Sequence, residues 1–253
     1  MQNFSELPCP CARRFLRVKI VAMMIPSPRH SARGNVFVMI FMAIVLLGLL
    51  TAAIRGFSGG RDTITQEQLK INAAQVLRDA AELALGVDQV IRNGASETAL
   101  RFAHPDAAAD YGSIATTPAY QVFSESGGQA RYHTAPADII ASGSGAWEFY
   151  GTTAIPQIGS DAPELIAVLP YVTASFCTAV NKQLGLTGQP DDSVTGTTPD
   201  CVEGGASKRF GPGAGFNATP NVLDSSSFSK LPMMHACVTC GTDYHFYSVL
   251  LTR

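Results

Sequence analysis

Charged residues are scarce in this chain of 253 residues: they make up 15% of it, whereas apolar residues make up 46%. The few charges are also unevenly placed. Residues 1–34 contain six Lys or Arg and one acid, and residues 55–253 contain 12 bases and 19 acids. A nucleic-acid-binding domain needs a basic surface on its folded body, whereas the body of this chain is acidic. The distribution argues against DNA or RNA binding and is typical of a chain oriented by a basic head.

The motifs that mark common enzyme classes are also missing. The sequence has no GxSxG, HExxH, GxxxxGK[ST] or GxGxxG pattern, which are the signatures of α/β-hydrolases, zinc proteases, P-loop NTPases and dinucleotide-binding domains. The glycine-rich stretch 211–215 follows no predicted strand, so we interpret it as a flexible turn. We therefore predict no catalytic residue and no cofactor, and we predict that the chain is not an enzyme.

Residues able to bind a metal are scattered. The four histidines after residue 55 show no spacing typical of a metal pair on a helix: His104, His133, His235 and His245. Asp191, Asp192 and Asp200 have the oxygen ligands that calcium prefers, but solvated loop charges are the favoured interpretation. We predict no metal site.

Charge is absent altogether from Asn35 to Ile54, a block of 20 residues between Arg33 and Arg55. A helix of this length spans about 30 Å, the thickness of the hydrocarbon core of a bilayer. The sequence therefore predicts a transmembrane helix over 35–54. Because basic residues precede the block, we expect a single-pass inner-membrane protein whose N-terminus is cytoplasmic and whose C-terminal domain is periplasmic or extracellular.

The apolar block also sets the expected domain boundaries. Residues 1–34 form a basic cytoplasmic leader, whose true start is predicted near Met24. Residues 55–62 form a glycine-containing linker, and residues 63–253 form the domain outside the cytoplasm. The alternative is a signal peptide cleaved after Ala53, although the apolar regions of such signals usually have roughly 7–15 residues.

Six cysteines divide between the two sides of the apolar block. Cys9 and Cys11 lie in the leader, and four lie in the body: Cys177, Cys201, Cys237 and Cys240. An even number beyond a membrane span predicts two disulfides. Three pairings are open, and we favour Cys177–Cys201 with Cys237–Cys240. The alternatives are a four-cysteine zinc site, which lacks the two close pairs of a zinc ribbon, and a redox-active CxxC, which here does not open a helix.

The clearest periodicity follows the linker. Apolar residues recur every seven positions at Leu69, Val76, Leu83 and Val90, which predicts an amphipathic helix with one face to bury. Thr63 is its expected N-cap, and Asn93-Gly94 is its expected end.

After residue 97, short aromatic and β-branched runs alternate with turn residues. We expect strands at 119–123 and 130–133 joined by a Gly-Gly turn, at 146–150, and at 244–251. A helix is expected over 173–184, and a long exposed loop over 187–227. The predicted fold class is α+β: after the transmembrane helix, an amphipathic helix packs on an antiparallel sheet, followed by a loop-rich C-terminal region tied by disulfides.

The stretch from Arg33 to Met39, Arg-Gly-Asn-Val-Phe-Val-Met, resembles the N-terminus of type IV pilin-like proteins and type II secretion pseudopilins. In that family a basic leader ends in Gly, and a prepilin peptidase cuts after it. The resemblance implies leader cleavage between Gly34 and Asn35. The family usually has Phe or Met after this Gly and Glu at the fifth mature position, where this chain has Asn35 and Met39.

The resemblance implies a membrane-anchored structural subunit of a pilus or secretion system, located outside the cytoplasm. Its expected partners are the lipid bilayer, a prepilin peptidase, and like subunits that contact the apolar helix; nucleic acid is not expected as a partner. The alternative is a non-polymerising single-pass membrane protein with a periplasmic binding domain. The fate of Gly34 distinguishes the two, because only the pilin-like class requires its cleavage.

Overall fold

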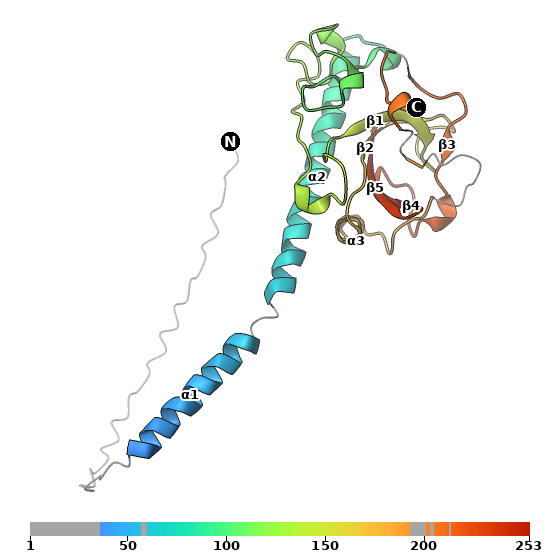
Figure 1. Ribbon diagram of the computed structural model, residues 1–253. Helices are drawn as coiled ribbons and strands as arrows, with labels where there is room; N and C mark the ends of the chain where they lie inside the picture. Colours follow the sequence, from blue (N-terminus) through green and yellow to red (C-terminus); the bar gives the residue numbers. More distant parts are fainter. Residues whose placement is uncertain (1–35, 57–59, 193–200, 203–204, 213) are drawn as a thin grey trace, which may run out of the picture. The chain divides into compact units, whose positions relative to one another are not determined.

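The computed structural model (Figure 1) describes residues 36–56, 60–192, 201–202, 205–212 and 214–253, and it describes the side chains of these residues except for 36, 50–56 and 60–64. The chain divides into two compact units, Met1–Phe57 and Ser58–Arg253. The leader residues, including Gly34 and Asn35, lie outside the described residues.

The described part of the first unit is the helix α1, from Val36 to Gly56. Its described side chains, residues 37–49, are all exposed. Among the described residues, no helix combines the length and the hydropathy that crossing a membrane requires. The predicted transmembrane helix over 35–54 is therefore wrong, because crossing a bilayer takes roughly 20 consecutive, predominantly apolar residues in one helix and no described helix meets the requirement.

The second unit is built around α2, a helix of 33 residues from Gly60 to Arg92. The helix begins before Thr63, so Thr63 is a helical residue and not the N-cap. The predicted core face is confirmed, since Val76, Leu83 and Val90 are at most 2% exposed. The helix ends at Arg92, directly before the expected Asn93-Gly94, and Gly94 has a positive φ of 93°. This left-handed conformation turns the chain so that the Ala95 N–H donates to the Val90 carbonyl, next to the bond from the Gly94 N–H to the Ile91 carbonyl.

A five-stranded sheet packs against this helix, which confirms the α+β class. Its strand order is β3-β1-β2-β5-β4, and every neighbouring pair is antiparallel except β1 and β3. The strands are β1 (Glu148–Ala154), β2 (Glu164–Leu169), β3 (Asn221–Val222), β4 (His235–Cys240) and β5 (Asp243–Leu251). The sheet is strongly curled, as Figure 1 shows.

The two faces of the sheet support two separate cores. On one face, alternate strand residues such as Phe149 and Phe246 pack with α2 and with α3, a helix from Ala174 to Gln183. On the other face, Tyr150 and Tyr247 pack under the segment that follows α3. This alternation follows from the two-residue period of a strand. The sheet therefore lies between a layer of helices on one face and an irregular layer on the other.

The expected strands at 119–123 and 130–133 do not form. The region between α2 and β1 is mostly irregular, with short 3-10 helices at Glu97–Ala99, Ala109–Tyr111, Pro118–Tyr120 and Ala137–Ile139. Gly127 and Gly128 serve close packing instead of a hairpin turn. A Cβ on Gly128 would lie 2.5 Å from the carbonyl oxygen of Gly86 in α2, so only glycine lets this segment approach the helix.

The predicted loop over 187–227 is more ordered than expected where it is described. It contributes β3 and the 3-10 helices Ala206–Lys208 and Ser225–Ser227. Cys201, Phe210 and Leu223 are buried, so the segment is fastened to the sheet at several points and covers its second face.

Candidate functional site

The four body cysteines form two disulfides, which confirms that part of the prediction. Cys177 is bonded to Cys237 with a Cα–Cα distance of 5.2 Å, and Cys201 to Cys240 with a Cα–Cα distance of 5.8 Å. The favoured pairing of Cys177 with Cys201 and of Cys237 with Cys240 is wrong. All four sulfurs are consumed in these bonds, so the same cysteines are not free for the zinc and redox alternatives.

The pairing follows from the strand that carries the CxxC motif. Cys237 and Cys240 are three residues apart on β4, and an odd spacing on a strand directs side chains to opposite faces of the sheet. Cys237 belongs to the core beneath α3, whereas Cys240 packs with the core on the other face. Each cysteine therefore finds its partner in a different layer.

A buried asparagine fixes the first disulfide. Asn181 on α3 is 1% exposed. Its Oδ1 accepts from the Cys237 N–H at 2.8 Å, and its Nδ2 donates to the Cys237 carbonyl at 2.8 Å. This paired bonding satisfies the Cys237 backbone groups on the outer edge of β4, and it connects α3 to the strand at the residue that forms the disulfide.

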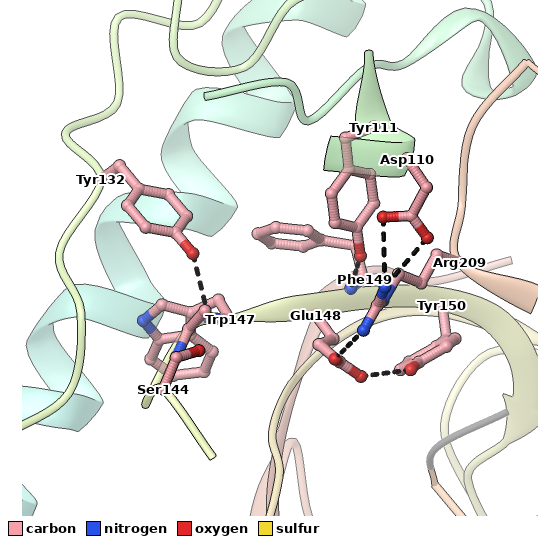
Figure 2. A network of polar contacts seen from close by, with 10 residues as sticks. Asp110, Tyr111, Tyr132, Ser144, Trp147, Glu148, Phe149, Tyr150 and Arg209 are labelled. Carbon is pink, nitrogen blue, oxygen red and sulfur yellow. Dashed lines mark hydrogen bonds and ion pairs between the residues drawn. The ribbon is translucent and has the colours of Figure 1, made fainter. Parts of the chain in front are cut away.

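A cluster of polar groups at the start of β1 joins three distant segments (Figure 2). Both Asp110 oxygens accept from Arg209 Nη1, at 2.9 and 3.1 Å, and Arg209 Nη2 donates to Glu148. The hydroxyl of Tyr150 donates to the other Glu148 oxygen. Burial lowers the pKa of the Arg209 guanidinium, but its hydrogen bonds to the two carboxylates outweigh this effect and raise that pKa overall.

Two tyrosines support the neighbouring backbone in the same view. The Tyr111 hydroxyl accepts from the Phe149 N–H at 2.7 Å, and the Tyr132 hydroxyl accepts from the Trp147 N–H at 3.2 Å. Burial raises the pKa of Tyr132 to about 12, so the phenol stays protonated at neutral pH. The contacts of Asp110, Glu148 and Arg209 join segments that are far apart in the sequence, so the cluster fastens the irregular region and the segment after α3 to the start of β1.

Where the structure describes them, the histidines and aspartates considered as metal ligands lie in different surroundings. Among the described residues, no group of three or more His, Cys, Asp or Glu is placed to hold a metal ion. His245 lies in the core beside the ring of Tyr171, and burial lowers its pKa to about 4. Asp192 is buried and accepts from Asn221 Nδ2 and the Asp224 N–H, each at 3.0 Å. It fastens the loop and is not the solvated charge expected; Asp200 lies outside the described residues.

Two exposed apolar surfaces are the remaining candidates for function. The first is α1, on which Phe37 is 80% exposed and Met39 is 77% exposed. The second is the face of α2 that points away from the core, where Ile71 is 60% exposed and Leu85 is 69% exposed. The core face of α2 could be predicted from its seven-residue period in the sequence. The exposure of the outer face could not, because only the structure shows that no described residue covers it.

Two grooves border α2. One, of about 510 Å³, lies between α2 and α3 and is lined by residues that include Leu69, Lys70 and Lys182. The other, of about 330 Å³, runs beside Leu85 and is closed on its far side by residues 128–130.

Comparison of the chain with protein-family models, with curated proteins and with solved structures gives no match. The two apolar surfaces, and the helices that present them, are therefore the features from which a function is inferred.

Proposed function

We propose that this chain is a pilin-like structural subunit that works outside the cytoplasm and assembles with like subunits through α1. In this proposal a prepilin peptidase removes residues 1–34, and α1 becomes the N-terminal assembly element of the mature protein.

The observation that carries the proposal is the surface of α1. From residue 37 to residue 49 every described side chain is exposed, and the sequence carries no charge from Asn35 to Ile54. Folded proteins rarely expose continuous apolar patches larger than a few hundred Å² unless the patch binds something. Because the apolar residues surround the whole helix and do not form one stripe, α1 fits the interior of a helical bundle.

The second unit supports the same proposal. The resemblance to type IV pilin-like proteins implies a helical spine, an antiparallel sheet and a disulfide-tied C-terminal region. The long helix α2, the mostly antiparallel sheet on one of its faces and the two disulfides support the proposal in this respect. Disulfides persist in oxidising compartments, which fits a site of action outside the cytoplasm.

Leader removal is the first test. Intact-mass analysis of the protein from cells that contain a prepilin peptidase should give a chain that begins at Asn35. Replacing Gly34 with leucine should block cleavage and leave the full-length mass. A wild-type chain that keeps its leader would contradict the proposal and favour the non-polymerising binding domain.

Direct contact between subunits is the second test. Cysteine at Phe41 or Ile44 should give subunit cross-links in cells that process the leader, in a background with Cys9 and Cys11 replaced by serine. Gly48→Leu should weaken them, since helix packing depends on close shape matching. Cysteine at Lys230, an exposed position in the second unit, is the control. Equal yields at all three positions would refute assembly through α1.

A further inference from the structure

The outer face of α2 carries a second, separate helix-packing surface. Its exposed residues follow the spacing of alternately three and four positions: Ile71, Ala74, Arg78, Ala81 and Leu85. We call this set the outer stripe. The spacing is that of a helix seam made to contact another helix. The two alanines allow a partner backbone to approach closely, whereas Ile71 and Leu85 project as apolar knobs.

We propose that the outer stripe binds the outer stripe of a second copy of this chain, with the two α2 helices antiparallel. This inference goes beyond the proposed assembly through α1 and does not depend on it, because it uses only residues of the second unit.

Charge selects this orientation. Glu67 and Lys70 lie at one end of the described stripe, and Asp88 and Arg92 lie at the other. In an antiparallel pair Glu67 faces Arg92 of the second copy, and Lys70 faces its Asp88. In a parallel pair in register, each of these residues would face the identical residue of the second copy, and the like charges would repel each other.

Side-chain size selects the same register. When Glu67 is placed opposite Arg92 of the second copy, Ala74 comes opposite Leu85, so that a small residue receives a large one. Ile71 then lies beside Leu85 and Gln89 of the second copy. These two residues line the groove of about 330 Å³ next to α2, and the groove gives the Ile71 knob a place to enter.

Competing contacts within one chain are weak. Arg78 approaches Asp79 only to 3.9 Å, and its side chain is 77% exposed. The Asp88–Arg92 ion pair, at 2.8 Å, is a surface pair within one helix, and such pairs contribute little. The charges can therefore be shared with a second copy. Two helix faces bury little compared with the ~1,600 Å² of a standard interface, so we expect a weak, concentration-dependent dimer.

The test is cross-linking of full-length protein that has Cys9 and Cys11 replaced by serine. One preparation carries Ala74→Cys and another, with a different tag, carries Leu85→Cys. A short bis-maleimide should join the mixed pair at least about tenfold more efficiently than it joins two Ala74→Cys chains, since antiparallel helices 8–10 Å apart bring only the mixed positions together. Leu85→Cys mixed with Lys230→Cys measures random collisions, because residue 230 is exposed and lies outside the stripe.

A charge swap provides an independent measurement. Lys70→Glu should lower the yield of the mixed cross-link about fivefold by placing like charges opposite each other, and adding Asp88→Lys should restore it. Efficient cross-linking between two Ala74→Cys chains would show a parallel contact and overturn the proposal. A mixed yield equal to the collision control, or a charge swap without effect, would overturn it as well. Association through α1 alone predicts no preference for the mixed pair. The cross-linking yields at the outer stripe therefore test this proposal independently of the proposed assembly through α1.

Discussion

Single residues hold together parts of this chain that are far apart in the sequence. Arg209 is the clearest case, because its guanidinium bonds Asp110 before the sheet and Glu148 at the start of β1. Its side chain is 20% exposed and that of Glu148 is 15% exposed. An ion pair this well covered is costly to break, since the remaining charges stay in a poorly solvated site.

Arg209→Met should therefore destabilise the second unit by about 3 kcal/mol, because it leaves the Asp110 and Glu148 carboxylates without their shared cation. Urea unfolding followed by far-UV circular dichroism measures the change. Lys182→Met, at an exposed position on α3, is the control and should change the free energy of unfolding by no more than about 0.5 kcal/mol. Equal effects of the two substitutions would show that Arg209 contributes no more than a surface charge.

At the scale of elements, α2 has two apolar faces with different roles. The inner face packs on the sheet and on α3, and Leu83 on this face is 2% exposed. The outer face holds Leu85, only two positions away but 69% exposed. Residues two apart on a helix do not share a face, so the same chemical change at the two positions has different consequences.

Leu83→Asp should destabilise the second unit by about 4 kcal/mol or more, because it buries a carboxylate without a partner. Leu85→Asp, its matched control, should leave the free energy of unfolding within about 0.5 kcal/mol of the wild type. Denaturant titration of dilute protein measures both changes. Similar losses from the two substitutions would mean that the two faces of α2 are not divided in this way.

At the scale of the whole second unit, the two disulfides join three layers. Cys177–Cys237 ties α3 to one face of the sheet, and Cys201–Cys240 ties the segment after α3 to the other. They close intervals of 60 and 39 residues, and in the chain-entropy model each contributes about 4 kcal/mol by restricting the unfolded chain.

Paired substitutions distinguish this connectivity from the pairing of Cys177 with Cys201 and of Cys237 with Cys240. In chains with Cys9 and Cys11 replaced by serine, Cys177→Ala with Cys237→Ala removes one whole disulfide. Thiol labelling under denaturing, non-reducing conditions should then find no free thiol. Cys177→Ala with Cys201→Ala removes one partner from each bond and should leave two free thiols. The opposite pattern would establish Cys177–Cys201 and Cys237–Cys240.

The sequence by itself determined the features that depend on local periodicity and composition. Leu69, Val76, Leu83 and Val90 repeat with the period of a helix face, so the core side of α2 was predictable, as were α3 and the last strand. Four cysteines beyond a basic head and an apolar block were enough to predict two disulfides. The apolar block was recognised too, but its assignment as a transmembrane helix went further than the described helix supports.

The tertiary structure decided what depends on contacts between distant segments. The disulfide pairing follows from the opposite faces of β4 on which Cys237 and Cys240 lie. Gly127 and Gly128 suggested a hairpin turn, but their lack of side chains lets Gly127 lie against the backbone of Gln121 and Gly128 against that of Gly86 in α2. Arg209 meets its partners across 61 and 99 residues, and the outer stripe is a candidate interface only because no described residue covers it. Such relations arise from packing in three dimensions, which local sequence patterns do not encode.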